Sequence, residues 1–493
     1  MSEDRTHVLE SGLLLGDRWV RDSLGGTMEH VNPATGKPHK TFAIASVAEV
    51  DEAVAAARTA FAEWRRWSPD ARRDVLLRLA SLLADYTREI GAISALESGN
   101  IYSDLVGDYV SEWFRYYAGW TDKIAGESLK PYPFTGVDFT VPEPVGVVGL
   151  IVTWNGPLGF CAMGGAPALA AGCCLVIKSP ELAPFSPVTF GRLCLEAGIP
   201  PGVVNVVTGG PDVGHALVSH PDVDKISFTG GTVTARKLQE ACAATLKPMV
   251  MELGGKSANI IFADADIDAA IPLSSRFTNN AGQGCSMPTR LLVERSVYDR
   301  VVDGVHERAR QVVAGDPFDP KVTMGPVISA SAVERILGIV REAESSGAGK
   351  LLLGGNRIGG DLAEGFFIEP TIFVDVDNGM RIAQEEVFGP VLSIIRFTDE
   401  DDAVRIANDT RFGLAAGVWT TSLRRAIVMA DRIRAGTVWV NNYRSTSTTS
   451  PFGGFKMSGF GREGGISGMR EYLEVKSVWI STTAEIPNPF VRR

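Results

Sequence analysis

The stretch NNAGQGCSMPTR (residues 279–290) contains a cysteine in surroundings that favour chemistry. Cys285 lies among glycines and small polar residues, between an apolar helix-like segment and the strand-like LLVE. A reactive thiol needs access and a lowered pKa, and a Gly-rich loop leaves it uncrowded. A free cysteine is more often buried and inert, which is our interpretation of the other five: Cys161, Cys173, Cys174, Cys194 and Cys242. Cys285 is therefore the candidate nucleophile.

Two further stretches carry groups that could assist a nucleophile. ELGGK (252–256) places Glu252 at the end of an apolar strand, where burial raises the pKa of a carboxyl and suits a general base or proton shuttle. VTWNGP (152–157) places Asn155 in a loop after a strand, where open α/β sheets bind ligands. Its amide could donate to a developing oxyanion. The alternatives are a surface glutamate that ends a strand and an asparagine that closes a turn.

Two stretches suit a nucleotide. KSPE (178–181) follows a strand and sets Lys178 and Glu181 three residues apart, where the carboxylate could accept from ribose hydroxyls. A carboxylate disfavours a 2′-phosphate, so we expect NAD rather than NADP, with NADP still possible; an exposed ion pair is the alternative. FTGGT (228–232) runs from a strand into a helix, and its glycines let a phosphate approach the helix N-terminus.

The bulk composition limits the remaining classes of function. A chain of 493 residues suggests two or three domains, and a net charge of −10 argues against nucleic acid or an anionic membrane surface as the main partner. Six cysteines form neither a disulfide framework nor a zinc pattern, and the six histidines form no HExxH motif. We therefore expect a reducing, cytoplasmic location and no metal site.

Alternating elements must hold these groups in place. Residues 49–96 have helical periodicity. From Pro144, the β-branched runs VGVVGLIV, CLVIK, VVNVV, KISF and MVMEL alternate with helix-like segments at 160–171, 186–197, 212–219 and 232–245. This alternation predicts a parallel sheet covered on both faces, as in a doubly wound α/β domain.

A second alternation follows in the chain. Its expected helices are 267–281, 297–314, 330–346, 400–409 and 422–434. Its expected strands are 258–262, 289–294, 349–353, 391–396, 415–420 and 437–440. The segments TGVDFTVPEP and EYLEVKSVWI look like strands outside both alternations, and could pair with each other or across subunits.

Neither terminal nor internal apolar segments indicate a membrane protein. The N-terminal MSEDRTHVLE is polar and acidic, unlike a secretory signal. Residues 145–177 carry no charge, but residues 153–157 and Pro167 interrupt the roughly 20 apolar residues that a span would need. We interpret the segment as buried strands, loop and helix.

Taken together, these stretches resemble the aldehyde dehydrogenase superfamily over nearly the whole chain. They occur in family order: VTWNGPL, KSPELAP, FTGGT, ELGGKSANIIFADADID, GQGC, MGPVIS, EEVFGPV and SPFGGFKMSGFGREGG. ELGGK followed by GQGC 33 positions later (285 − 252) is the most specific pair. Eight stretches in this order are too many for an accidental similarity.

The resemblance implies a covalent mechanism. The Cys285 thiolate would attack an aldehyde carbonyl, and the Asn155 amide and the Cys285 backbone N–H would stabilise the oxyanion of the hemithioacetal. Hydride transfer to the cofactor would leave a thioester, from which Glu252 would release the acid by activating water. The residues implied in NAD binding are Ile151, Val152, Trp154, Lys178, Glu181, Gly210, Gly214, Phe228, Gly230, Gly231, Leu253, Glu386 and Phe388.

The resemblance also places the aldehyde tunnel and shows two departures. Its expected walls are Gly156, Phe160, Met163, Gly284, Ser286, Tyr443, Arg444, Thr446 and Phe452. Relatives often carry an aromatic residue at Gly156, so a wide tunnel for a bulky apolar or aromatic aldehyde is expected. Relatives often have serine at Gly231, which puts one phosphate hydrogen bond in doubt. Arg444, if it points inward, would instead favour a semialdehyde with a distal carboxylate.

The expected fold is α/β, with a Rossmann-like doubly wound cofactor domain, an α/β catalytic domain and a small β oligomerisation element. The expected ranges are 1–121 and 144–254 for the NAD-binding domain, 255–457 for the catalytic domain, and 122–143 and 458–493 for the oligomerisation element. The last implies a homodimer or homotetramer.

Two rival functions remain open. A CoA-acylating dehydrogenase would pass the acyl group to CoA, although it would not need Glu252 as a base for water. A catalytically silent relative would serve as a binding or structural protein, although intact Cys285, Glu252 and Asn155 argue against it.

Overall fold

The structure is a computed structural model that describes residues 5–132, 135–482 and 490. Residues 1–4 of the N-terminal segment lie outside the described part. So do 133–134, 483–489 and 491–493, which belong to the two ranges expected to form the oligomerisation element.

An eight-stranded sheet forms the centre of the first half of the molecule, with the strand order β2-β1-β9-β8-β7-β10-β11-β21. Its strands are β1 (Leu13–Leu15), β2 (Arg18–Val20), β7 (Val147–Ile151), β8 (Cys174–Ser179), β9 (Val204–Thr208), β10 (Lys225–Thr229), β11 (Met249–Glu252) and β21 (Gly459–Phe460). The five central strands are parallel, while β1 and β21 pair antiparallel to their neighbours. Four of these central strands are buried over their whole length and β10 over all but its last residue, which explains their continuous apolar runs. The predicted doubly wound domain is confirmed.

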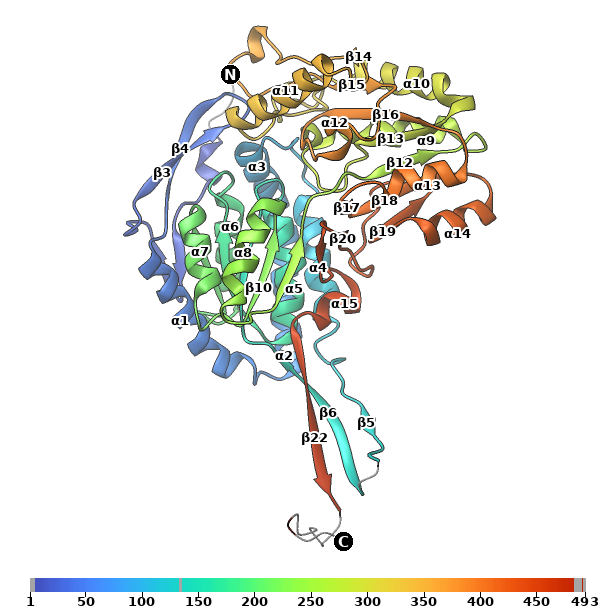
Figure 1. Cartoon of the computed structure of the whole chain (residues 1–493). Helices are drawn as coiled ribbons and strands as arrows, with labels where there is room; N and C mark the ends of the chain where they lie inside the picture. Colours follow the sequence, from blue (N-terminus) through green and yellow to red (C-terminus); the bar gives the residue numbers. More distant parts are fainter. Residues whose placement is uncertain (1–4, 133–134, 483–489, 491–493) are drawn as a thin grey trace.

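Helices cover both faces of this sheet (Figure 1). They are α1 (Val47–Trp64), α2 (Pro69–Asp85), α3 (Thr87–Ser98), α4 (Val106–Ala118), α5 (Pro157–Ala171), α6 (Phe185–Glu196), α7 (Pro211–Ser219) and α8 (Thr232–Ala243). Because right-handed crossovers take the chain from β7 outward in one direction and then back, α5 and α6 cover one face, and α7 and α8 the other. The order reverses beside β7, which is the place where such sheets bind ligands.

A seven-stranded sheet forms the second half, with the order β14-β15-β16-β13-β12-β18-β19. Its strands are β12 (Ala258–Ile261), β13 (Arg290–Glu294), β14 (Lys350–Leu353), β15 (Thr371–Val374), β16 (Val391–Phe397), β18 (Ala415–Trp419) and β19 (Thr437–Val440). Its helices are α9 (Ile267–Ser274), α10 (Tyr298–Arg310), α11 (Ala330–Ser345), α12 (Arg381–Gln384), α13 (Glu400–Asn408) and α14 (Leu423–Arg432). The second predicted alternation is thus present, with β15 and α12 as elements that the pattern did not reveal.

The helix predicted over residues 267–281 is too long. The α-helix ends at Ser274 and continues as 3₁₀ turns over Ser275–Gly282, in which Asn280 and Ala281 have φ values of 50° and 51°. These left-handed residues break the helical hydrogen bonding and turn the chain toward Cys285.

The two strand-like segments outside both alternations pair with each other. β6 (Gly136–Pro144) and β22 (Leu473–Ser481) run antiparallel over nine residues each, and β5 (Ser128–Leu129) adds a third strand. Figure 1 shows this arm projecting away from both sheets. The predicted division into ranges stays a prediction; β21, which lies within 458–493, pairs with β11 of the first sheet.

The remaining elements are short or peripheral. They are β3 (Thr27–Asn32) with β4 (Lys37–Ala43), β17 (Phe412–Gly413) with β20 (Phe455–Lys456), and α15 (Gly465–Arg470).

Candidate active site

A cavity of about 420 Å³ lies at the carboxyl edge of the first sheet, and Cys285, Glu252 and Asn155 all line it. The three residues come from segments that are far apart in the chain and belong to both halves of the molecule. Asn155 follows β7 and Glu252 ends β11, whereas Cys285 lies between α9 and β13. The structure therefore brings together the three predicted catalytic residues at one place.

The loop before Cys285 is built to pass close to other backbone. Gly282 has a φ of 73°, and a Cβ at this position would lie 2.0 Å from the carbonyl oxygen of Gly389. Only glycine fits such a left-handed residue against backbone. Gly282 of the GQGC sequence is thus required by the approach of this loop to the FGP segment, and the residue Cys285 is half-buried.

Gln283 anchors the same loop, and sequence reasoning missed it. Its Oε1 accepts from the N–H of Ile328 at 2.8 Å, and its Nε2 donates to the carbonyl oxygens of Asn280 at 3.1 Å and Pro326 at 3.3 Å. The side chain is buried. The sequence offered one signal for this role, which is a glutamine among glycines and other small residues. A buried amide side chain must find hydrogen-bond partners.

Asn155 is held in reach of the nucleophile. Its Nδ2 donates to the carbonyl oxygen of Gln283 at 3.0 Å, and its loop is fixed by the Ser98 hydroxyl, which donates to the carbonyl oxygen of Trp154 at 2.7 Å. An amide nitrogen carries two hydrogens, so the second one is available for an oxyanion.

Glu252 is buried, with 4% of its surface exposed, and neither carboxyl oxygen has a hydrogen-bond partner. Burial raises the pKa of Glu252 well above its usual range, the neighbouring Glu463 raises it further, and Arg462 opposes both. Leaving a buried carboxyl without partners costs stability, so such a group is retained where chemistry uses it.

Glu463 is a second carboxyl that sequence reasoning did not assign. It is buried, its Oε2 has no partner, and burial raises its pKa to about 8. Its backbone pairs with that of Phe452, which brings the GREGG segment beside PFGG. The two buried carboxyls interact, so their protons come off as a pair.

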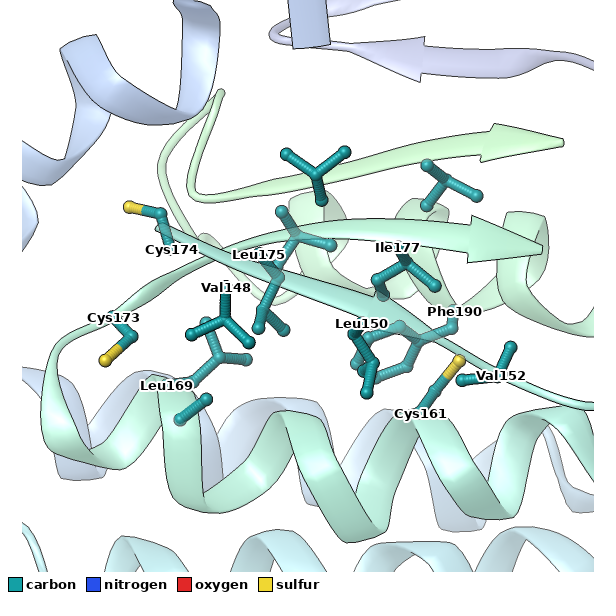
Figure 2. Close-up of a cluster of buried hydrophobic side chains, with 14 of the residues drawn as sticks. Val148, Leu150, Val152, Cys161, Leu169, Cys173, Cys174, Leu175, Ile177 and Phe190 are labelled. Atoms are coloured by element: carbon teal, nitrogen blue, oxygen red, sulfur yellow. The ribbon is translucent and has the colours of Figure 1, made fainter. Parts of the chain in front are cut away.

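The thiol of Cys285 does not meet the requirement of a lowered pKa in the protein alone. Burial, followed by Glu386 and Glu252, raises its pKa to about 12, and the Arg444 guanidinium is the charge that opposes them. The other five cysteines are buried, and burial raises the pKa of each thiol. Figure 2 shows Cys161, Cys173 and Cys174 among apolar side chains of the first sheet and α5. Cys285 differs from them in facing a cavity.

Six residues expected to bind the cofactor line the same cavity: Trp154, Gly230, Gly231, Leu253, Glu386 and Phe388. The Glu386 carboxylate accepts from the N–H of Gly255 at 3.1 Å, and burial raises its pKa to about 7. A Cβ at Gly254 would lie 2.0 Å from its Oε2, which explains the glycine there. Trp154 and Phe388 meet edge to face with ring centroids 5.4 Å apart.

The other expected cofactor residues follow the carboxyl edge away from Cys285. Lys178, at the end of β8, pairs with Glu181 at 3.2 Å, and the N–H of Val152 donates to the Lys178 carbonyl at 3.3 Å. Ile151 and Phe228 lie on the neighbouring strands β7 and β10, while Gly210, Gly214 and Gly231 lie at or near the starts of α7 and α8. A Cβ at any of these three glycines would meet no atom within 4 Å, so each leaves open space.

A second cavity of about 160 Å³ meets the first at Cys285 and Phe160. Five further expected substrate residues line it: Met163, Ser286, Arg444, Thr446 and Phe452. Tyr109 and Trp113 of α4 line it too and were missed, because nothing in the sequence links α4 to this loop. At Gly156 a Cβ would meet only the Phe160 ring, at 3.7 Å, and at Gly284 it would meet Met287. Tyr443 is fully buried against Trp439.

The described residues contain no cluster of three or more side chains suited to hold a metal ion. None of their helices is long and apolar enough to cross a membrane.

Comparisons with known proteins show similarity over nearly the whole chain. The chain is 43% identical over 486 residues to retinal dehydrogenase 2 of Homo sapiens, with 96% of this chain and 92% of that protein covered. Betaine aldehyde dehydrogenase of Staphylococcus aureus, solved in complex with NAD⁺, superposes with a TM-score of 0.96 at 33% identity, with 99% of each chain covered. A mutant aldehyde dehydrogenase of Bacillus cereus superposes with a TM-score of 0.94 at 37% identity, with 98% of this chain and 99% of that chain covered.

The family comparison covers nearly all of the chain. Residues 19–478 match the model of the aldehyde dehydrogenase family. This range includes Cys285, Glu252 and Asn155, which line the 420 Å³ cavity. The protein therefore belongs to the aldehyde dehydrogenase family.

Proposed function

We propose that the protein oxidises aldehydes to carboxylic acids with NAD, through a thioester on Cys285. The observation that carries this proposal is the meeting of Cys285, Glu252 and Asn155 in one cavity at the carboxyl edge of a doubly wound sheet. Overall, one aldehyde, one NAD⁺ and one water give one acid, one NADH and one proton.

The chain's own groups act in every step at carbon except the acceptance of the hydride. The Sγ of the Cys285 thiolate forms a bond to the aldehyde carbon, while the second amide hydrogen of Asn155 and the Cys285 N–H donate hydrogen bonds to the oxyanion that develops. Loss of hydride from that carbon, to the acceptor that NAD⁺ would supply, would leave a thioester. Glu252, once ionised, takes a proton from water, whose oxygen then attacks the thioester carbon, and the thiolate leaves.

The residues present fit NAD. The open spaces at Gly210, Gly214 and Gly231 lie at helix starts, where backbone N–H groups favour phosphate. Glu181 and Lys178 would hold the adenosine ribose, and Leu253, Glu386 and Phe388 the nicotinamide half. When bound, NAD⁺ supplies the hydride acceptor and a positive charge near the thiol. A positive charge there lowers the pKa of Cys285, which the protein alone raises.

We propose NAD rather than NADP as the preferred cofactor. Glu181 would repel a 2′-phosphate, and Lys178 is already paired with Glu181. A differential of about 1.4 kcal/mol or more corresponds to a preference of about tenfold or more in kcat/KM.

The second cavity supports an aldehyde with a bulky, mainly apolar body. Trp113, Phe160, Met163 and Phe452 form apolar walls, and Gly156 leaves room beside the Phe160 ring. Each buried CH₂ contributes about 0.8 kcal/mol, so such a substrate gains affinity over acetaldehyde. A clear preference for acetaldehyde over benzaldehyde and a C10 terpenoid aldehyde in kcat/KM would contradict this substrate class.

One experiment separates the proposed activity from its two rivals. NADH formation from NAD and a panel of aldehydes is followed at 340 nm, with and without CoA, for wild type and Cys285→Ala. We expect turnover without CoA in wild type alone. Turnover only with CoA would show a CoA-acylating enzyme, in which Glu252 would have another role. No turnover with any aldehyde, in protein shown to be folded, would indicate a silent relative.

We further propose that the arm assembles the chain into a homodimer or homotetramer. The strands β5, β6 and β22 carry exposed apolar side chains, among them Val475 (69% exposed), Trp479 (56%) and Ile480 (52%). A long edge strand with apolar side chains tends to pair with another chain. Light scattering of wild type and Trp479→Ser tests this, since a wild-type monomer would refute it.

We propose a cytoplasmic location because of the state of the cysteines. All six are free in the structure, which suits the reducing cytoplasm. The test is to label the cysteines of this protein in a cell fraction with a thiol reagent, before and after reduction. More labelling after reduction would reveal disulfides and would show that this location is wrong.

A further inference from the structure

Arg444 is a largely enclosed cation without a carboxylate partner. Its Nη1 donates to Met287 Sδ at 3.1 Å, and a thioether is a weak acceptor. Within residues 5–132 and 135–482 it forms no ion pair, and burial lowers its pKa. The charged or polar groups that act on it are Cys285, Tyr443, Arg276 and Tyr109, none of which is a carboxylate.

Arg290 is a buried arginine whose guanidinium is hydrogen-bonded entirely within the protein, and it serves as a comparison for Arg444. Its guanidinium donates to the carbonyl oxygens of Lys256 at 2.9 Å, Ile406 at 3.0 Å and Ala407 at 3.0 Å, and to Asn378 Oδ1 at 2.9 Å. Four good acceptors surround one cation, whereas Arg444 has one sulfur. Because an arginine carries five N–H donors, most of those of Arg444 remain for another molecule.

The backbone holds Arg444 at a fixed place. Arg444 has a φ of 61°, a left-handed conformation that side chains other than glycine rarely adopt. The residues on either side are hydrogen-bonded: Arg276 donates to the Tyr443 carbonyl at 3.3 Å, and the Trp439 indole donates to the Ser445 carbonyl at 2.8 Å. Such a conformation persists where the surroundings determine it, and it is common at binding sites.

The guanidinium and the nucleophile line the same small cavity. Cys285 and Arg444 both line the 160 Å³ space, and so do the apolar side chains that suit the body of an aldehyde. The hydroxyl-bearing residues Ser445, Ser447 and Ser450 lie on the Arg444 side of the chain and also line the space. A planar guanidinium with hydroxyl neighbours is the usual receptor for a carboxylate.

We propose that Arg444 binds a carboxylate at the far end of the substrate, so that the enzyme oxidises aldehyde acids with an apolar or aromatic body. The inference rests on the proposed function and adds the end group that the apolar walls alone do not specify. It requires no further reactant, because the carboxylate is bound and not changed.

Arg444 has one rival role, which is to assist the thiol. It is the charge that lowers the pKa of Cys285 against burial and three carboxylates. If this were its whole role, replacing it would slow neutral and acidic aldehydes by the same factor. The ratio of the two rates therefore separates the roles.

The experiment compares two matched substrate pairs, benzaldehyde with 4-formylbenzoate and hexanal with 6-oxohexanoate. We measure kcat/KM with NAD for wild type, Arg444→Met and Arg444→Lys, after checking the folding of each by circular dichroism. We expect wild type to prefer the acid of at least one pair by about tenfold or more, as a charge-assisted pair supports. Arg444→Met should lower this ratio at least tenfold, and Arg444→Lys, which keeps the charge without the fork, should lower it less.

Two outcomes would overturn the inference. Wild type could show no preference for the acid of either pair, or the acid-over-neutral ratio could stay unchanged in Arg444→Met because both members of each pair fall equally. The wild-type ratio alone tests the inference if the variants do not fold. Absence of turnover with all four aldehydes would instead refute the proposed function itself.

Discussion

Replacing Glu252 with glutamine should affect the thiol and the turnover in opposite directions. Glu252 is one of the three carboxylates, with Glu386 and Glu463, that add to burial in raising the pKa of Cys285 to about 12, from an ordinary value of 9.0. A difference of three (12 − 9.0) corresponds to a thiolate fraction about a thousandfold smaller at any pH below 9, or about 4 kcal/mol. Glutamine keeps the shape of Glu252 and removes its charge.

The size of the effect follows from the order of the causes. Burial contributes most to the raised pKa of Cys285, then Glu386, then Glu252, so glutamine should recover only a part of the thousandfold, about tenfold or less. The pKa of Glu252 itself lies well above 4.5, so this carboxyl is neutral in acid and charged only at higher pH. The variant should therefore react like wild type at low pH and faster as the pH rises.

The assay is alkylation of Cys285 by iodoacetamide without cofactor, from pH 6 to 10, with the modified peptide quantified by mass spectrometry. The matched control is Glu385→Gln, which also removes a carboxylate from the cavity lining but one that does not act on the Cys285 pKa. With NAD and an aldehyde, Glu252→Gln should give a burst of NADH and then little steady turnover. Alkylation no faster than wild type at every pH would refute the electrostatic reasoning, and loss of the burst would place Glu252 at or before hydride transfer.

Three further predictions test other parts of the molecule. Asn155→Ala should lower kcat about 10²- to 10³-fold with little change in NAD affinity, and a loss below tenfold would remove Asn155 from the oxyanion site. Glu181→Gln should lower the NAD-over-NADP ratio of kcat/KM by about tenfold, which steady-state kinetics with both cofactors would show; an unchanged ratio would contradict the role of its charge. Glu97 is fully buried and hydrogen-bonded to Phe185 and Ser186, and burial raises its pKa to about 7 from 4.5, so its contribution to stability is complete below about pH 4.5 and is lost as the pH rises through 7. Glu97→Gln keeps the neutral form, so its melting temperature should gain on that of wild type between pH 5 and 8, by the equivalent of about 3 kcal/mol at most, and a gap independent of pH would contradict this.

The fold was predictable wherever the local pattern and the tertiary environment agree. The five central strands of the first sheet are buried on both faces, so their β-branched runs were clear in the sequence. The strand Thr371–Val374 was missed because four residues after a proline give too short a run for a periodicity. The helix after Ile267 was predicted too long, because apolar spacing continues past the point where left-handed residues end it.

The site was predictable to the extent that single residues carry their chemistry. Cys285, Glu252 and Asn155 could be chosen by their type and their place after a strand or in a Gly-rich loop. Gln283 acts through contacts with a distant segment at Ile328, and Glu463 acts on the pKa of Glu252, and no spacing in the sequence reveals either. The pKa of Cys285 likewise depends on Glu386, a hundred residues further along the chain.

The hydrogen bond from Asn155 to the Gln283 carbonyl joins the two halves of the molecule two residues before Cys285. The proposed oxyanion donor belongs to the first half and the proposed nucleophile to the second, so neither half contains the complete proposed site. The nucleotide-binding half therefore cannot be exchanged between relatives independently of the half that carries the cysteine. A chimera that joins the first half of this chain to the second half of a relative would have to preserve the fit between these two loops as well as each core. Recombination should succeed most often where the crossover lies outside both loops and the partner brings a glutamine and a glycine in the same places before its cysteine.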